Sequence, residues 1–142
     1  MFSKAESKKI REEFWTSFGK RYSRKWILYN TRIKDLQLKF SFDNEKAKVS
    51  LDITSADEIL RAYHFEKVIS LKSVLKNDYL PEAIFVENFI LPEEKIISTV
   101  YVELPKVNIH NKKDWPVVYE FLYKNMTVLE TFFLEFEDYI KD

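Results

Sequence analysis

Acidic side chains on the predicted strands are the residues whose types could support catalysis. Asp52 falls on one strand, and Glu93-Glu94-Lys95 has the Glu-x-Lys spacing with which nuclease sites hold Mg²⁺ and steady the attacking water. The Glu-x-Lys group, however, falls at the turn between two strands. The simpler interpretation, which we favour, is that Asp52 forms cross-strand ion pairs with Lys39 and Lys48 on an exposed sheet face.

A second acidic pair, Glu87 and Glu103, falls on neighbouring predicted strands, so the two side chains could lie close together. Two carboxylates in a cleft could hydrolyse a glycosidic bond, and one of them would then have a raised pKa. No part of the sequence indicates such a cleft. Asp52, Glu87 and Glu103 are therefore weak catalytic candidates. The polar Asn88 beside Glu87 interrupts an otherwise apolar strand.

A mixed basic and aromatic segment at the end of the first predicted helix is the best candidate for binding nucleic acid. Its candidate residues are Lys20, Arg21, Tyr22, Arg24, Lys25 and Trp26. Arginine and lysine bind phosphates, while an aromatic ring stacks on a base. The alternative is a solvated helix end with Trp26 buried, and we favour it because one short basic run is a weak motif.

The composition excludes most cofactor and metal chemistry. The single glycine, Gly19, cannot supply a phosphate-binding loop or a dinucleotide fingerprint. The chain has no cysteine, and its two histidines are far apart in sequence, so we expect no metal site and no cofactor. His64 lies on the apolar face of a predicted helix, where a buried histidine with its hydrogen bonds made is more common than a catalytic one. We expect His110, in a loop, to face solvent.

Length and charge predict a single folded domain over residues 1–142. The chain is 46% hydrophobic and 32% charged, with a high aromatic share of 16%. We find no signal peptide and no apolar stretch that could span a bilayer, so we expect a cytoplasmic protein without membrane contact. Residues 1–39 hold eleven Lys and Arg against four Asp and Glu, and residues 114–142 hold seven Asp and Glu against two Lys. We expect the terminal helices to pack together and neutralise these ends.

The candidate residues must be positioned by the elements of an α+β fold. Residues 3–22 have helical spacing, and Ser3 and Glu6 have the spacing of a capping box. Residues 36–42 and 46–53 alternate between apolar and polar, which predicts a hairpin. Residues 26–33 add either a short strand or an extended lead-in.

A second hairpin and a second helix are predicted in the middle of the chain. Ser55 and Glu58 again have capping-box spacing and begin one helix that runs to about Asn77. Residues 84–91 and 96–104 are rich in β-branched and aromatic residues, which predicts the second pair of strands. The expected order is αββαββα, a mostly antiparallel four-stranded sheet of two hairpins packed with three helices.

The last predicted helix is long for a chain of this size. It begins at Asp114-Trp115-Pro116, with Asp114 as the cap, and its apolar spacing continues to Ile140. At ~1.5 Å per residue it would extend for ~40 Å. A second apolar stripe consists of Val117, Phe121, Val128 and Phe132. The helix is therefore packed between the sheet and another helix, or it meets a second subunit and forms a homodimer.

Six short segments follow one another along nearly the whole chain. They are Phe2-Ser3-Lys4-Ala5, Phe14-Trp15-Thr16-Ser17-Phe18-Gly19-Lys20, Trp26-Ile27-x-Tyr29, Ile33-Lys34-Asp35-Leu36, Glu103-Leu104-Pro105 and Asn111-Lys112-Lys113-Asp114-Trp115-Pro116. This order resembles a bacterial family, the domain of unknown function DUF4268. Similar domains occur alone and at the carboxyl end of longer proteins with nuclease-like regions, so the resemblance implies a link to DNA processing or defence. It carries over no catalytic residue, and Asp52 stands where a Glu is expected in similar proteins.

We expect a non-enzymatic interaction or accessory module. Recognition would use the polar sheet face, the segment from Lys20 to Trp26, or the last helix. The alternative is a nuclease-like enzyme or another hydrolase that uses Asp52 with Glu87, Glu103 or Glu93. An enzyme would bring these carboxylates together in a pocket, whereas a binding module would present a polar or aromatic patch.

Overall fold

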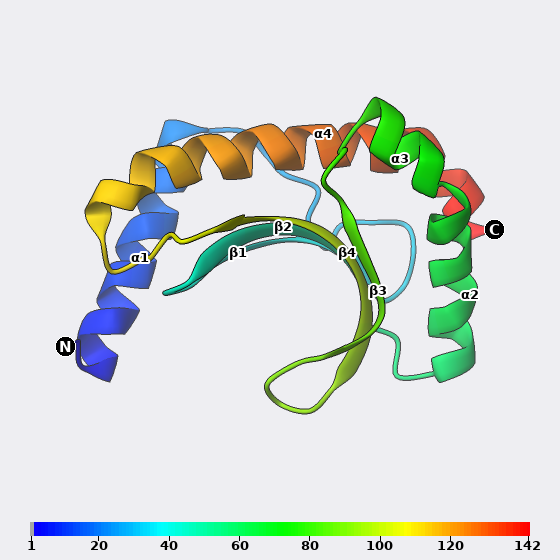
Figure 1. Ribbon diagram of the computed structural model, residues 1–142, viewed down its shortest axis with the longest axis horizontal. Helices are drawn as coiled ribbons and strands as arrows, with labels where there is room; N and C mark the ends of the chain where they lie inside the picture. Colours follow the sequence, from blue (N-terminus) through cyan, green and yellow to red (C-terminus); the bar gives the residue numbers. More distant parts are fainter. Residues whose placement is uncertain (1) are drawn as a thin grey trace.

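The protein is an arched four-stranded sheet whose helices lie on its convex side and at one end (Figure 1). The computed structural model describes residues 2–142. Its helices are α1 (Lys4–Arg21), α2 (Glu58–Ser70), α3 (Lys72–Asp78), the 3₁₀ turn η1 (Lys112–Asp114) and α4 (Trp115–Lys141). Its strands are β1 (Leu36–Phe42), β2 (Lys46–Ile53), β3 (Ile84–Ile90) and β4 (Ile96–Pro105). The expected α+β class and the two hairpins are confirmed, while one expected helix is divided into α2 and α3.

The four strands pair in the order β1-β2-β4-β3, and every pair is antiparallel. The two hairpins therefore meet through their second strands, β2 and β4, where Val49 lies opposite Val102. Because side chains alternate between the faces of a strand, the apolar residues of β2 face α4 and its polar residues face the opposite, concave side. Among residues 2–142, no helix covers that concave side in Figure 1.

The core lies between the convex face of the sheet and the helices α1 and α4. Phe14 of α1 is fully buried, and its ring meets the edges of Phe42 on β1 and Trp115 on α4 at centroid distances of 4.8 and 5.2 Å. Edge-to-face contacts of this kind add to the free energy of burying the rings. The position of Phe14 in α1 thus determines where this helix packs against both the sheet and α4.

Three of the four residues in the second apolar stripe of α4 are packed inside this chain, and the fourth, Val117, is exposed. Phe132 is fully buried and lies 5.3 Å from the ring of Tyr79, which follows α3. Phe121 and Val128 are half-buried beside the turn at residues 79–82. The helix is therefore packed between the sheet and the end of α3, which is the first of the two expected arrangements. A homodimer through α4 stays a prediction.

Two predicted helix boundaries are wrong in detail. The cap of α2 is Asp57, whose Oδ1 accepts from the backbone N–H groups of Ile59 and Leu60 at 3.0 and 3.3 Å, so Ser55 and Glu58 form no capping box. The helix is interrupted at Leu71, where φ and ψ are −97° and 8°. The Leu71 side chain is buried, so its packing in the core stabilises the break between α2 and α3.

Asp114 precedes α4 as expected, but its side chain does not cap that helix. It makes no side-chain hydrogen bond to the helix, and its Oδ2 accepts from the N–H of Asn108 at 2.9 Å. The carboxylate therefore fixes the preceding loop rather than the first turn of α4.

The connection from α1 to β1, residues 22–35, is fastened to α4 by two buried glutamates. Glu130 accepts from the backbone N–H of Ile27 at 2.7 Å and pairs with Arg24. Glu137, seven residues further along the same helix, accepts from the N–H and Nε of Arg32 at 2.9 and 3.3 Å. Residues 26–33 form no strand, so of the two expected forms the short strand is wrong. The side chains of α4 bind the N–H groups of Ile27 and Arg32, and the Leu28 carbonyl accepts from the Leu38 N–H of β1 at 2.9 Å.

The two charged ends of the chain are neutralised in a different way from the one expected. The terminal helices do pack together near the start of α4, where the Phe14 ring of α1 lies against Trp115 and Tyr119, and Lys112 Nζ of the preceding η1 is 2.7 Å from Glu13. The acidic end of α4 pairs with Arg24 and Arg32 of the connection, and no ion pair within residues 2–142 joins it to a lysine of α1. The lysines at the start of α1 therefore remain a separate basic region.

Substituting Glu130 should destabilise the fold markedly. The variant Glu130→Ala should lower the free energy of unfolding by about 2–4 kcal/mol, because it leaves the Ile27 N–H and Arg24 without their acceptor. Glu130→Gln keeps an acceptor and should lose less. Glu135→Ala removes an exposed carboxylate from the same helix and should change stability by less than about 0.5 kcal/mol. Urea unfolding followed by circular dichroism measures all three, and equal losses for Glu130→Ala and Glu135→Ala would contradict this account.

Candidate functional site

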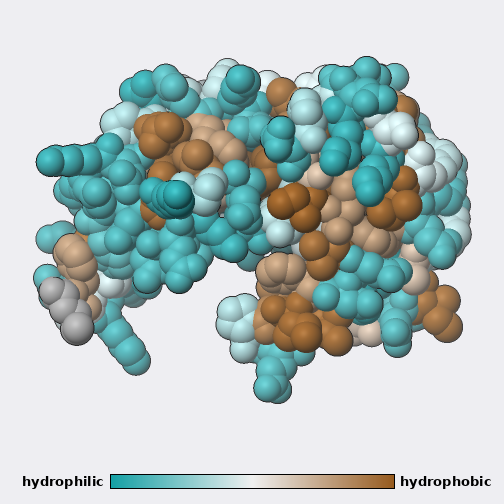
Figure 2. Space-filling model, in the orientation of Figure 1, coloured by the Kyte–Doolittle hydropathy of each residue, from teal (hydrophilic) through white to brown (hydrophobic). Residues whose placement is uncertain are grey.

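The concave face of the sheet is the candidate binding surface. The register places the following side chains on it: Gln37, Lys39 and Ser41 from β1; Lys46, Lys48, Ser50 and Asp52 from β2; Ile97, Thr99, Tyr101 and Glu103 from β4; and Ile84, Val86 and Phe89 from β3. Figure 2 shows the hollow beneath the arch, with apolar side chains gathered over the β3–β4 hairpin on one side of it. The exposed isoleucines of this hairpin are Ile84, Ile90 and Ile96; by the register, Ile84 lies on the concave face, and Ile90 and Ile96 lie on the opposite face.

The β3–β4 hairpin curls beneath the arch, which deepens the hollow (Figure 1). Phe89 lies opposite Ile97, four positions along β4 from Tyr101, a separation of about 13 Å along a flat strand. The centroids of the Phe89 and Tyr101 rings are nevertheless only 6.4 Å apart. The curl therefore brings an aromatic pair to the middle of the face.

Lys48 extends from β2 into this aromatic pair. Its Nζ lies 4.7 Å from the centroid of the Phe89 ring and 4.2 Å from that of Tyr101, within cation–π distance of both. Burial lowers the pKa of the Lys48 ammonium, and the nearby positive charge of Lys46 lowers that pKa further. The centre of the face thus combines one half-buried cation with two rings.

Asp52 makes no ion pair on this face, so its expected pairs with Lys39 and Lys48 are wrong. It is buried, and its Oδ1 accepts from the hydroxyl of Thr99, directly opposite on β4, at 2.7 Å. The register explains the difference, because Lys39 lies opposite Ser50 rather than opposite Asp52. A threonine that sequence analysis did not single out is the partner.

The acidic candidates do not converge. Asp52 and Glu103 share the concave face, but Glu103 lies four positions beyond Thr99 on β4, about 13 Å away, and its Oε1 is 3.8 Å from Lys46 Nζ. Glu87 lies in the irregular part of β3, and its backbone carbonyl accepts from Ser98 Oγ at 2.6 Å. Glu87 therefore sits about five positions along β4 from Glu103, so their expected proximity is wrong. Within residues 2–142 there is no group of three or more acidic, His or Cys side chains that could hold a metal ion.

The basic and aromatic segment is largely engaged within the fold. The guanidinium of Arg24 lies 3.8 Å from the Trp26 ring and pairs with Glu130, while Trp26 is half-buried against Phe40 at 5.2 Å. Tyr22 stacks on Tyr123 of α4 at 4.3 Å. The guanidinium of Arg21 lies over the Tyr22 and Tyr119 rings, both at 5.6 Å. Lys20 and Lys25 are exposed. A nucleic-acid site on this segment stays a prediction, and Lys20 and Lys25 are the residues that would mainly contact the nucleic acid.

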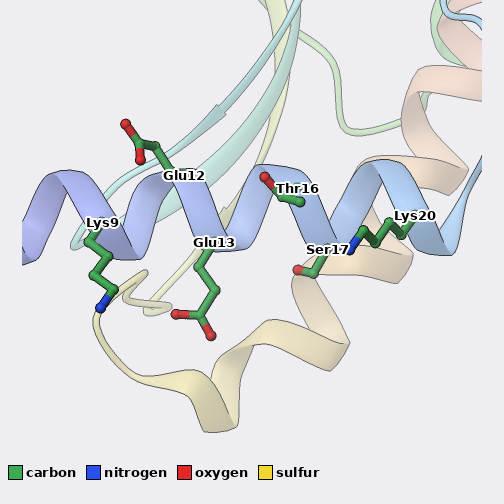
Figure 3. Close-up of a pocket in the computed structure, with 6 residues that line it drawn as sticks. All are labelled: Lys9, Glu12, Glu13, Thr16, Ser17 and Lys20. Carbon is green, nitrogen blue, oxygen red and sulfur yellow. The ribbon is translucent and has the colours of Figure 1, made fainter.

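A shallow hollow on the outside of α1 does not bring polar groups together as a catalytic or binding site would (Figure 3). It is lined by Lys9, Glu12, Glu13, Thr16, Ser17 and Lys20, which all project from one helix and spread apart. Glu13 is paired with Lys112 of η1, and Ser17 Oγ is hydrogen-bonded to the hydroxyl of Tyr119 on α4. The polar groups that could act together are therefore used to hold α1 against its neighbours.

Each histidine departs from its expected environment in one respect. His64 is buried, but its Nδ1 has no hydrogen-bond partner, so the expectation that its hydrogen bonds would be made is wrong. Burial lowers the pKa of His64, and the charge of Lys67 lowers it further. His110 is half-buried rather than facing solvent: its Nε2 is 2.9 Å from Ser7 Oγ, and its ring stacks on Phe2 at 4.6 Å.

The fold and this surface define an α+β protein with one sheet face free of helices in the part of the chain that the structure describes. The family model for the domain of unknown function DUF4268 matches residues 10–137, so the chain belongs to that family, as the resemblance implied. Neither the curated proteins nor the solved structures include a match to this chain. In the described part of the chain, none of the helices combines the length and the apolar character needed to cross a bilayer.

His64 should make the stability of the protein depend on pH. Since its pKa is lower in the folded than in the unfolded chain, the unfolded chain takes up more protons as the pH falls through the ordinary histidine value of about 6.5. Stability is therefore lost as the pH falls from 7.5 to 5.5. The variant His64→Gln should lose less over the same range, which urea unfolding at the two pH values will measure. An unchanged pH dependence in His64→Gln would show that other groups cause the loss.

Proposed function

We propose that this protein is a non-enzymatic binding module that takes single-stranded nucleic acid on the concave face of its sheet. The observation that carries the proposal is the position of Lys48 against the rings of Phe89 and Tyr101 in the middle of that face. Proteins that bind single strands combine cations that contact phosphates with aromatic rings on which bases stack.

The charges of the concave face favour an anionic partner. It carries three lysines and two carboxylates, but Asp52 is buried against Thr99 and Glu103 lies beside Lys46. Lys39 is exposed, and no ion pair in the described chain includes it. A nucleic-acid strand whose phosphates contact Lys39 and Lys48 would release counterions, and binding would therefore be tighter at low salt.

The shape of the surface favours a single strand over a duplex. Phe89 and Tyr101 are half-buried on the concave face, and their rings can stack only on bases that are not already stacked within a duplex. Stacking on a ring accepts any base, so we expect little sequence preference. Such a module would suit the link to DNA processing or defence that the family resemblance implies. A location in the bacterial cytoplasm would fit the absence of cysteine, because disulfides are rare in that reducing compartment.

Substitutions on the concave face should weaken binding of a fluorescein-labelled, 20-nucleotide oligothymidylate measured by fluorescence anisotropy. Tyr101→Ala should raise the Kd at least about fivefold, because it removes a stacking ring, whereas Tyr101→Phe keeps the ring and should bind nearly as tightly as the wild type.

Lys39→Ala should reduce the slope of log K against log salt by about 0.7 in the same anisotropy assay, because about 0.7 is the contribution of one phosphate contact.

Variants of the other candidate segment separate the two surfaces. Lys20→Ala with Lys25→Ala removes the two exposed lysines of that segment and should leave the Kd nearly unchanged. A larger loss in this double variant than in Tyr101→Ala would move the site to the segment from Lys20 to Trp26. Degradation of the oligonucleotide when Mg²⁺ is added, lost in Asp52→Asn, would favour the nuclease-like alternative.

A further inference from the structure

A cavity that is open to solvent lies outside the concave face, between the start of α2 and the irregular part of β3. Its volume is about 630 Å³, and a smaller hollow of about 100 Å³ shares Glu58, Arg61 and Asn88 with it. A volume of this size accommodates a small metabolite. Neither the family nor the proposed nucleic-acid surface accounts for this cavity.

Arg61 is the residue that makes the cavity unusual. It is only 7% exposed, and its guanidinium makes a single hydrogen bond, from Nη2 to Asn88 Oδ1 at 3.2 Å. None of the ion pairs in residues 2–142 includes Arg61. An arginine keeps its charge at any ordinary pH, and a buried charge without a counter-charge is costly.

The unused donors of Arg61 are not fully enclosed by protein. Within the described residues, the one fully buried side-chain nitrogen or oxygen without a partner belongs to His64, not to Arg61. Since Arg61 also lines the cavity, its remaining N–H groups reach the space inside it. A planar guanidinium presents two parallel donors to a carboxylate, which is the group that it binds most specifically in proteins.

The irregular register of β3 supplies a second donor. The pairing of β3 with β4 shifts between Val86 and Phe89, so Glu87 and Asn88 form a bulge, and Ser98 Oγ fixes it by donating to the Glu87 carbonyl. Such bulges redirect side chains and are common beside binding sites. Asn88 uses its oxygen to accept from Arg61, which leaves its amide NH₂ free to donate to a ligand beside the guanidinium.

Carboxylates outnumber cations among the charged residues of the lining. Glu58, Glu94 and Glu87 contribute three carboxylates, against Arg61 and Lys95 as the cations. A ligand with only negative charge would be repelled by these glutamates, and one with only positive charge would leave Arg61 unpaired. A ligand that carries both charges a few ångströms apart satisfies both sides of the cavity.

We propose that this cavity binds a small zwitterion with the head group of an α-amino acid. Its carboxylate accepts from the Arg61 guanidinium and the Asn88 amide, and its ammonium faces the carboxylates of Glu58 and Glu87. The site shares no residue with the concave face, so the inference does not depend on the proposed nucleic-acid function.

Isothermal titration calorimetry with each of the twenty standard L-amino acids tests the proposal, with acetate and methylamine as probes that carry one charge each. At least one amino acid should bind with a Kd below 10 mM, and acetate and methylamine should bind at least tenfold more weakly. Arg61→Lys should weaken amino-acid binding at least tenfold, because a lysine lacks the paired donors. Arg11→Lys, the same change at an exposed position on α1, should have no effect.

Two further variants keep the test decisive if the Arg61 variant does not fold. Asn88→Ala and Glu87→Gln change exposed residues, and each should weaken amino-acid binding severalfold, whereas Glu87→Gln should not weaken the binding of acetate. The proposal is overturned if none of the twenty amino acids binds, if acetate binds as tightly as the best amino acid, or if the variants at Asn88 and Glu87 leave the Kd unchanged.

Discussion

Two buried carboxylates on α4, those of Glu130 and Glu137, hold the connection between α1 and β1 in place, and the architecture depends on this attachment. Each accepts a backbone N–H from the connection, and together they pair with Arg24 and Arg32. The backbone N–H groups of Ile27 and Arg32 are thereby satisfied by side chains of a helix. The connection stays on the convex side with α1 and α4, and the opposite face of the sheet is left open.

The curvature of the sheet then determines what the open face can do. The curl of the β3–β4 hairpin brings the Phe89 ring to Tyr101 and Lys48, which a flat sheet would hold apart. The bulge in the same hairpin directs Asn88 to the other side, toward Arg61. One irregular hairpin thus shapes both candidate binding sites, on opposite sides of the edge strand.

Local patterns predicted most of the fold but little of either site. The Ser3–Glu6 capping box and the alternation of β1 and β2 are local signals, and the structure confirms them. The break at Leu71 and the hydrogen bonds of Glu130 depend on packing between distant segments, which no local spacing records. The pairing of Asp52 with Thr99 required the register between the two hairpins, and Asn88 gave a visible signal as a polar residue in an apolar strand.

The most direct test of the account is to map, by amide chemical shifts in ¹⁵N-labelled protein, where a short oligothymidylate binds. If the concave face is the binding surface, the largest changes will fall on residues 48–52 of β2 and 99–101 of β4, and the Lys39 amide will shift with them. Changes confined to residues 20–26, or no changes at saturating oligonucleotide and low salt, would contradict the claim that this face binds single-stranded nucleic acid.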